Sequence, residues 1–177
     1  MATLSRSVPQ GARNPESRLI AEYVAVTFPR DRVMLRVPLG PSVVPPDAFP
    51  DWIRRLRASR GWRPEVDAVV IRDDNVLLIE AKVNEVLYGM AKLPFYKLLV
   101  DDTPELEPWY GLEVRMRLVA PATAKWVDLL AERTGIEVDL YRPPWIETYL
   151  AYRAAYWDRE HRLAREENRK ARGRLGL

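Results

Sequence analysis

The clearest pattern in the chain is a pair of short apolar segments separated by a few polar residues. Residues 65–83 read EVDAVVIRDDNVLLIEAKV, and the residues on either side of the central RDDN are mainly valine, isoleucine and leucine. Short segments of this composition, bounded by turn-forming residues, are typical of two β-strands joined in a hairpin. Both faces of this hairpin are apolar, so we predict that it is buried on both sides.

The rest of the chain alternates between helical and extended patterns. Helices are predicted over residues 14–27, 84–100, 121–134 and 145–172, and further strands over 32–39, 113–120 and 136–141. In the helix over 121–134, Trp126, Leu129 and Leu130 are expected on the buried face. Pro38 restricts the first strand to a short or edge position. Together these elements predict an α/β fold with a mixed central β-sheet of about five strands, flanked by helices.

The same pattern divides the chain into three regions. Residues 1–13 are polar and are expected to form a flexible tail, residues 14–144 a core domain, and residues 145–177 a long charged C-terminal helix. Within the core, residues 47–60 are predicted to form a basic helical insertion that carries Arg54, Arg55 and Arg57. Two interpretations stay open for these arginines: they face phosphates, or they form a solvated face of a packing helix.

Length and composition exclude several classes of protein. The chain has 177 residues, of which 47% are hydrophobic and 30% charged, and this fits a globular protein with one core. It has no cysteine, which excludes disulfides and cysteine-ligated zinc. No apolar run approaches the roughly 20 residues of a membrane span. We therefore expect a cytoplasmic protein without membrane contact, in a host cell or a virion if the chain is viral.

The net charge is +3, and most of the basic residues are arginines. Only five of the 28 basic residues are lysines. Arginine suits bidentate contacts with phosphate, but it also becomes more frequent in GC-rich genomes. The charge therefore permits a nucleic-acid partner without establishing one.

Three charged residues interrupt the apolar hairpin: Asp67 on its first strand, and Glu80 and Lys82 on its second. If Asp73-Asp74 form the turn, Asp67 lies opposite Glu80. If the turn is one residue later, Asp67 lies opposite Lys82. In either register all three side chains share one face, because opposite residues point the same way.

Two opposed carboxylates in apolar surroundings are destabilising unless a cation lies between them. With no cysteine and a single histidine in the chain, the oxygen ligands favour Mg²⁺ or Mn²⁺ over zinc. Lys82 would point into the same site, where burial and a nearby cation are expected to lower its pKa so that it can orient or deprotonate a water. The alternative is a buried salt bridge between Lys82 and one carboxylate.

The spacing of Asp67 from Glu80-Ala81-Lys82 on adjacent strands, followed by a helix, closely resembles the PD-(D/E)XK nuclease superfamily. The resemblance implies a restriction-endonuclease-like fold over most of the chain. It also implies that Asp67, Glu80 and the backbone carbonyl of Ala81 bind the metal and that Lys82 assists the attacking water. Val66 stands where the proline of the motif usually precedes the aspartate.

The resemblance further implies roles for residues outside the hairpin. A glutamate on the first helix often helps to hold the metal, and Glu22 is the best match. One branch of the superfamily carries a glutamine and a tyrosine four residues apart on the helix after the hairpin, where this chain has Lys92 and Tyr96, with Tyr88 one turn earlier. We expect these three side chains to face a nucleic acid.

The sequence therefore favours an Mg²⁺-dependent nuclease that acts on DNA, with Asp67, Glu80 and Lys82 as its catalytic residues. Two alternatives reuse the fold without catalysis: a structural or assembly protein, for example of a virus particle, and a DNA-binding module. The charged end of the C-terminal helix is either solvated or in contact with phosphates or another subunit. A homo-oligomer or larger assembly formed through this helix is therefore a further prediction.

Overall fold

The computed structural model describes residues 14–42 and 63–174, and within the last helix it describes only part of the side chains. The predicted tail over 1–13 and the predicted basic insertion over 47–60, including Arg54, Arg55 and Arg57, lie outside the described residues. The chain divides into two units at residue 142. Each unit is described by itself below.

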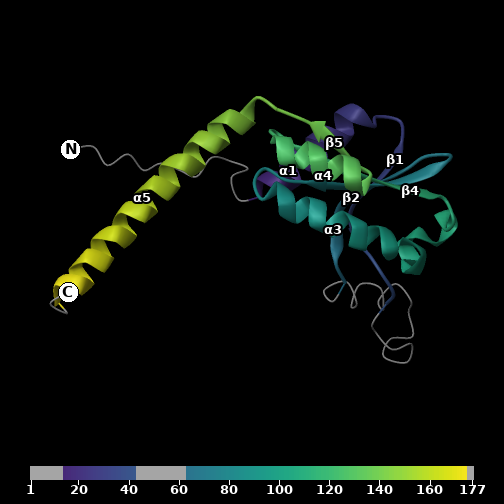
Figure 1. Cartoon of the computed structure of the whole chain (residues 1–177). Coiled ribbons are helices and arrows are strands. Elements are labelled where there is room, and N and C mark those ends of the chain that lie inside the picture. Colours follow the sequence, from purple (N-terminus) through teal and green to yellow (C-terminus); the bar gives the residue numbers. More distant parts are fainter. Residues whose placement is uncertain (1–13, 43–62, 175–177) are drawn as a thin grey trace, which may run out of the picture. The chain divides into compact units, whose positions relative to one another are not determined.

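A five-stranded sheet forms the centre of the first unit (Figure 1). Its strands, in spatial order, are β1 (Arg32–Pro38), β2 (Glu65–Ile71), β3 (Asn75–Ala81), β4 (Glu113–Ala120) and β5 (Ile136–Leu140). β1, β2 and β3 pair antiparallel, whereas β3, β4 and β5 pair parallel. This is the mixed sheet of about five strands that the sequence predicts, and Pro38 lies on its edge strand.

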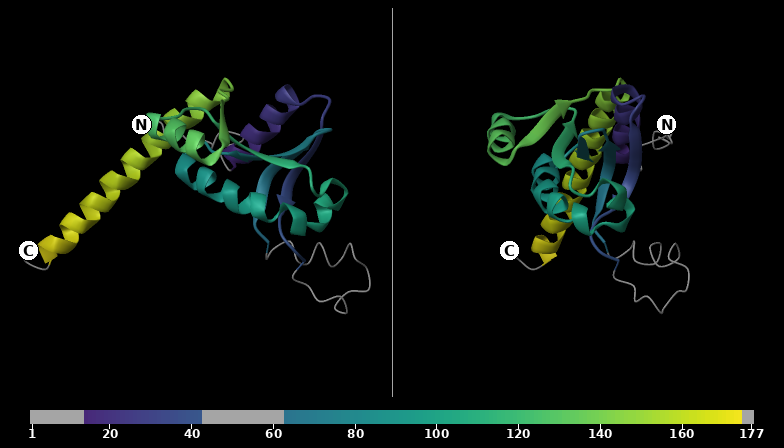
Figure 2. Two further views of the ribbon diagram at one scale, coloured as in Figure 1. Left: turned by 45° about the vertical axis from the view of Figure 1, so that its right-hand side comes forward. Right: turned by 90° about the vertical axis from the view of Figure 1, so that its right-hand side faces the viewer.

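Helices cover both faces of this sheet. The described helices of the first unit are α1 (Pro15–Thr27), α3 (Val86–Leu98) and α4 (Lys125–Thr134), with 3₁₀ segments η3 (Val100–Asp102) and η4 (Pro104–Trp109). α3 and α4 lie on one face and α1 on the other (Figure 2). Both parallel connections therefore carry their helix on the same face, as right-handed crossovers do.

The hairpin β2–β3 is buried on both faces, as the sequence predicts. All seven residues of β3 are buried. Val69 and Leu78 belong to the core beneath α3 and α4, and their neighbours Val70 and Leu77 point to the opposite face. The charged residues of the hairpin therefore lie at the end of two strands that are otherwise buried.

A buried ion pair holds the start of β2. The Arg63 guanidinium donates two hydrogen bonds, of 2.8 and 2.7 Å, to the Glu105 carboxylate and a third, of 2.8 Å, to the Pro38 carbonyl. Leu39 N donates to the Pro64 carbonyl at 2.8 Å. These contacts bring the end of β1 beside the start of β2, at the end of the sheet that carries Asp67.

One helix differs from its predicted orientation. α4 begins at Lys125, four residues later than expected, and Val127 is its buried residue. Trp126 and Leu129, which were expected on the buried face, are 45% and 48% exposed. The side of the helix that packs on the core carries Val127, Leu130 and Ala131, so the prediction was wrong for Trp126 and Leu129.

The described part of the second unit, residues 143–174, contains one helix, α5 (Trp145–Arg174). It spans the range that the sequence predicts, with two more residues at its end. Arg153 donates a hydrogen bond of 3.2 Å to the Tyr149 hydroxyl one turn earlier. Among the described residues, no helix is both long and apolar enough to cross a membrane.

Candidate active site at the end of the hairpin

The structure decides between the two registers of the hairpin. Ala68 pairs with Ile79, and Arg72 N donates to the Asn75 carbonyl at 3.0 Å across the turn. The two turn residues are therefore Asp73 and Asp74. Continuing this register by one residue places Asp67 opposite Glu80.

Of the two opposed carboxylates, Glu80 is the more unusual, because its carboxyl group lies inside the core. The residue is 1% exposed. Burial first, and then a hydrogen bond and the charge of Asp67, raise the pKa of Glu80 to about 8, although Lys82 and Lys92 oppose the shift. The Glu80 carboxyl group therefore retains a proton near neutral pH.

Glu80 also has an oxygen that no hydrogen bond satisfies. Lys92 Nζ lies 3.3 Å from Glu80 Oε1. The approach does not meet hydrogen-bond geometry, so Oε1 is buried without a donor. A buried carboxylate oxygen in this state is destabilising unless another positive group reaches it.

Asp67 is fixed by the backbone of the opposite strand. Its Oδ2 accepts a hydrogen bond of 2.9 Å from the Ala81 amide. This bond holds the Asp67 carboxylate beside Glu80 and ties it to the residue that links Glu80 to Lys82.

Lys82 does not pair with either hairpin carboxylate. Its Nζ donates to Glu16 Oε2, in the first turn of α1, at 2.9 Å. Burial lowers the pKa of Lys82, but the hydrogen bond to Glu16 and the charges of Glu80, Glu16 and Asp67 together raise it above its usual value. In the absence of a cation these acidic groups outweigh the effect of burial on the pKa of Lys82, and the lowering expected beside a bound cation stays a prediction.

Gly89 of α3 allows the helix to pass close to Lys82. A Cβ at this position would lie 2.7 Å from Lys82 Cγ and 3.0 Å from Leu118 Cδ1. Only glycine leaves room for the lysine stem between α3 and the sheet. No sequence pattern singled out this glycine, because the contact joins residues on different elements.

Of the three residues of α3 that were expected to face a nucleic acid, only some lie toward the carboxylates. Lys92 Nζ lies 4.5 Å from the centre of the Tyr88 ring and 6.0 Å from that of Tyr96, in addition to its contact with Glu80. Tyr96 is buried and donates a hydrogen bond of 3.1 Å to the Glu65 carbonyl. Tyr88 is 58% exposed. Lys92 and Tyr88 are therefore accessible from the site, whereas Tyr96 supports the strand beneath it.

Arg36 lies on the edge strand directly beside Asp67. Leu35 pairs with Ala68 and Val37 with Val66, so Arg36 is opposite Asp67. Its φ is 55°, in the left-handed region that non-glycine residues rarely adopt. Its Nε donates to Glu65 Oε1 at 2.7 Å, and its side chain is 69% exposed. Such local strain clusters at functional sites, and no sequence pattern indicated it.

The first helix also brings a glutamate to the site that the sequence did not single out, Glu16. Glu22 accepts a hydrogen bond of 2.7 Å from Arg18, one turn earlier on α1, whereas Glu16 contacts Lys82. Glu16 lies three and four residues before the buried Leu19 and Ile20, so helical spacing places it on the inward face. That spacing was the available signal.

The donors present suit a small hard cation. Among residues 14–42 and 63–174 there is no cluster of three or more acidic or histidine side chains that could enclose a metal. Mg²⁺ does not need one, because it commonly uses one or two carboxylates and completes its shell with water and substrate oxygens. The opposed Asp67 and Glu80, with an unsatisfied buried oxygen on Glu80, fit that requirement.

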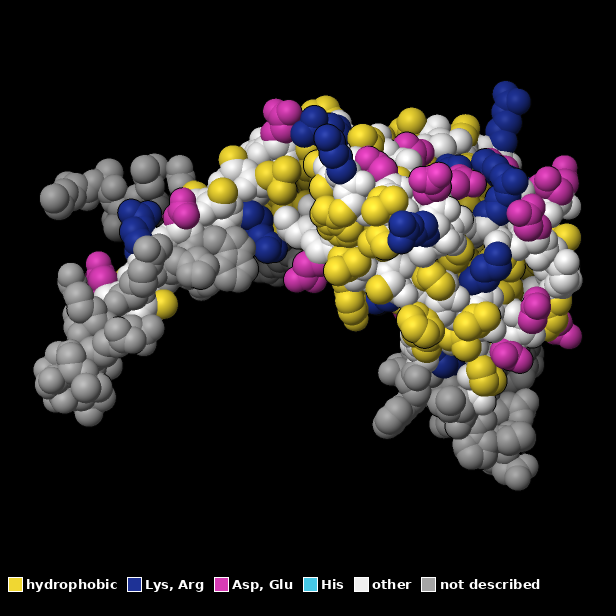
Figure 3. Space-filling view, in the orientation of Figure 1, with side chains coloured by type: hydrophobic (Ala, Val, Ile, Leu, Met, Phe, Trp, Pro, Cys, Tyr) yellow, Lys and Arg dark blue, Asp and Glu magenta, His cyan; other side chains and the backbone are white. Residues whose placement is uncertain are grey.

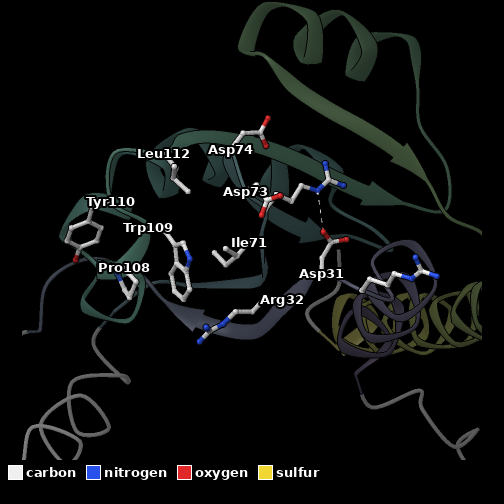
Figure 4. Close-up of a pocket in the computed structure, with 11 residues that line it drawn as sticks. Asp31, Arg32, Ile71, Asp73, Asp74, Pro108, Trp109, Tyr110 and Leu112 are labelled. Atoms are coloured by element: carbon white, nitrogen blue, oxygen red, sulfur yellow. Dashed lines mark ion pairs between the residues drawn. The ribbon is translucent and has the colours of Figure 1, made fainter.

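A separate cleft opens at the other end of the hairpin (Figure 4). It has a volume of about 1180 Å³ and is lined by the turn of β2–β3, the α1–β1 connection and the end of η4. The Arg32 guanidinium lies 4.6 Å from the centre of the Trp109 ring, and Arg72 Nε lies 3.9 Å from Asp31 Oδ1. Its three arginines and three aspartates balance. None of the predicted catalytic residues lines it.

Known proteins provide only distant comparisons. No family model and no curated protein matches the chain. A repair endonuclease from Pyrococcus abyssi is 21% identical with a TM-score of 0.45, over 80% of this chain and 51% of that one. EndoMS, solved as a complex with dsDNA, is 20% identical with a TM-score of 0.45, over 81% of this chain and 50% of that one. A protein of unknown function is 16% identical with a TM-score of 0.41, over 78% and 62%.

The chain thus spans about half the length of the two endonucleases that it resembles. Because the identities are this low and the TM-scores lie below 0.5, the comparison says nothing about the reaction that this chain performs. The chemistry of the site has to carry that argument.

Proposed function

We propose that the chain is a divalent-metal-dependent nuclease that hydrolyses phosphodiester bonds of DNA. The observation that supports this proposal best is the Glu80 carboxyl group: it is buried, lies opposite Asp67 and has an oxygen without a donor. A hydrophobic side chain of similar size would stabilise the core more. Such a pair is therefore better explained by a cation that it binds than by folding.

Asp67, Glu80 and the Ala81 carbonyl would hold the ion, Mg²⁺ or Mn²⁺. When bound, such an ion supplies Lewis-acid polarisation of a phosphodiester oxygen. Both carboxylates come from paired strands with a defined register, so their separation is set by the sheet rather than by a loop. Glu22 stays a prediction as an additional ligand, and Glu16 is the acid of α1 that contacts the site.

Lys82 would act on the attacking water and on the charge that develops at phosphorus. Its ammonium group is held by Glu16 at 2.9 Å, which fixes its direction before substrate arrives. A fixed positive charge at this point donates hydrogen bonds to a water or a phosphate oxygen without rearrangement. Glu16 is thus a positioning residue for Lys82.

Lys92 and Arg36 would contact the substrate. Lys92 and Arg36 place positive charge on two sides of the carboxylate pair, on α3 and β1, and both contact acidic groups in the free chain. A phosphate could replace those carboxylates as their partner. The predicted phosphate contacts of Arg54, Arg55 and Arg57 belong to the segment that joins β1 to β2, whose ends meet at this end of the sheet.

A cleavage assay tests the proposal. The full chain would be incubated with labelled linear, circular and single-stranded DNA in Mg²⁺, in Mn²⁺ and in EDTA. We expect cleavage only with metal, and a loss of at least roughly a hundredfold in Asp67→Ala, Glu80→Gln and Lys82→Ala, because each removes a group that acts on the reacting phosphate. Asp73→Asn, which removes an exposed carboxylate at the far end of the same hairpin, should cleave like the unmodified chain.

Metal binding provides a readout that does not depend on cleavage. Mg²⁺ should raise the melting temperature of the unmodified chain and of Lys82→Ala, but not that of Asp67→Ala, because ligand binding stabilises only a chain that can bind it. Absence of cleavage with every metal and substrate, together with no Mg²⁺ effect on melting, would refute the proposal and favour a binding or assembly role.

A further inference from the structure

The outward face of α3 is apolar, which is unusual for a helix on the surface of a unit. α3 reads VLYGMAKLPFYKL and contains only two charged residues, Lys92 and Lys97. Its inward residues are Gly89, Met90, Leu93 and Tyr96, all buried. On the opposite face Leu87 is 56% exposed, Phe95 68% and Leu98 76%. A helix that is apolar all round is normally buried on every side.

The exposed side chains of α3 lie near those of α4. Leu87, Ala91, Phe95 and Leu98 recur at helical spacing, so they share one side of α3. α4 packs beside α3 and exposes Trp126 and Leu129. Figure 3 shows hydrophobic side chains gathered over both helices. The apolar patch consists of Leu87, Tyr88, Phe95, Leu98, Trp126 and Leu129.

The area of the apolar patch matches what a stable protein interface needs. Taking about 200 Å² for each large side chain, the exposed fractions of the six residues amount to roughly 700 Å². A standard interface buries about 800 Å² on each partner, whereas the largest apolar patch on a typical monomer is about 300–600 Å². Aromatic residues are also enriched, as they are in interface cores.

We propose that the apolar patch binds a second copy of this chain, with α3 packed antiparallel to the partner's α3 about a two-fold axis. A two-fold axis places each residue that lies near it beside the same residue of the partner. A charged residue there would therefore meet a like charge. The stripe from Leu87 to Leu98 carries no charge, and Lys92 turns away from it to Glu80. An apolar stripe that lacks any charge is the kind that can pair with itself.

Residue sizes along the stripe are complementary under the same two-fold. With the axis between Ala91 and Phe95, the large Phe95 of one copy lies over the small Ala91 of the other, and Leu98 lies beside Tyr88. Alternating large and small residues across facing positions lets two helices interlock. Leu87 and the α4 residues Trp126 and Leu129 would close the edges of this contact.

The oligomeric state of the full chain tests this inference. We expect sedimentation velocity to give a dimer for the unmodified chain and a monomer for the double variant Phe95→Lys and Leu98→Lys. Both changes are at exposed positions, so the variant should keep its far-UV circular dichroism and its Mg²⁺-induced rise in melting temperature. Val26→Lys, at an equally exposed position on α1 (69%), should remain dimeric.

A single cysteine reports on the geometry, because the chain contains none of its own. Ala91→Cys should be captured as a dimer by a short bismaleimide reagent, whereas Val26→Cys should not. A monomeric unmodified chain would overturn the inference, and so would a dimer that persists in the double lysine variant, since such a dimer forms through α5 or another surface. Capture of both cysteine variants to the same extent would overturn it as well.

Discussion

At the scale of single residues, Glu80 links the chemistry of the site to the stability of the fold. Its pKa in the folded, metal-free chain is raised to about 8. In the unfolded chain a glutamate titrates near 4.3. Between these values the folded state holds a proton that the unfolded state has released, so the free energy of unfolding falls as the pH rises through this window.

Glu80→Gln should remove that loss, since glutamine carries no titratable group. In EDTA, we expect the free energy of unfolding of the variant to rise relative to that of the unmodified chain, by roughly 1–3 kcal/mol between pH 5 and pH 8. Urea denaturation at several pH values measures the difference. The same variant should show no stabilisation by Mg²⁺. If the two chains lose stability in parallel over this range, the interpretation of Glu80 is wrong.

Arg36 is a second residue whose proposed role in function comes with a cost to the stability of the fold. Its φ of 55° is strained for any side chain, and the ion pair that it forms with Glu65 is exposed and therefore weak. Arg36→Gly should relieve the strain and keep or raise the free energy of unfolding by about 1 kcal/mol.

The same Arg36→Gly variant should bind DNA less tightly, because it lacks a cation beside the site. The dependence of its DNA affinity on salt concentration should weaken by the amount that corresponds to about one lost phosphate contact. Fluorescence anisotropy in Ca²⁺ or EDTA at several salt concentrations measures both quantities. Unchanged affinity at every salt concentration would exclude Arg36 from the DNA contact. Arg18→Gly, on the exposed face of α1, controls for the loss of one arginine elsewhere.

At the scale of elements, the approach of α3 to the sheet determines where Lys82 lies. Gly89→Ala would normally stabilise a helix by roughly 1 kcal/mol. Here the added Cβ would meet Lys82 Cγ at 2.7 Å and Leu118 Cδ1 at 3.0 Å, so the lysine stem has to move.

We therefore expect Gly89→Ala to reduce DNA cleavage at least tenfold, because displacing a catalytic group by about 1 Å has effects of this size. Asp67 and Glu80 are untouched, so the rise in melting temperature with Mg²⁺ should persist. Loss of cleavage and metal stabilisation together would indicate a general disruption instead. Full activity would show that Lys82 tolerates the shift or takes no part in cleavage.

α1 and β5 are joined by a polar network on the other face of the sheet. The Tyr23 hydroxyl donates to Asp139 Oδ2 at 2.6 Å and accepts from Arg117 at 3.0 Å. Burial, followed by the bond to Asp139, raises the pKa of Tyr23 to about 12, so the hydroxyl stays protonated as a donor. The network fixes α1, and with it Glu16, relative to the strands.

At the scale of the whole molecule, self-association through the apolar patch would make stability depend on concentration. A folded dimer unfolds to two chains, so its melting temperature rises with protein concentration. We expect this rise for the unmodified chain in differential scanning calorimetry and its absence for Phe95→Lys with Leu98→Lys. A melting temperature that is independent of concentration in both chains would contradict the dimer.

The sequence by itself determined the elements, the sheet and the charged trio of the hairpin. The hairpin strands could be located because they are apolar on both faces and bounded by turn residues, and β4 because its apolar and charged residues alternate. Pro38 placed β1 at the edge, since proline cannot donate to a second neighbour. These are local properties, because each depends on residues that are close together in the sequence.

The tertiary structure decided which distant residues complete the site. Two registers were compatible with the hairpin, and the Asp73-Asp74 turn selected the one with Asp67 opposite Glu80. Glu16 rather than Glu22 reaches Lys82 because the path of α1 across the sheet sets which turn of the helix meets the strand end. The role of Gly89 likewise depends on how closely two elements approach, and that distance is not encoded within either segment alone.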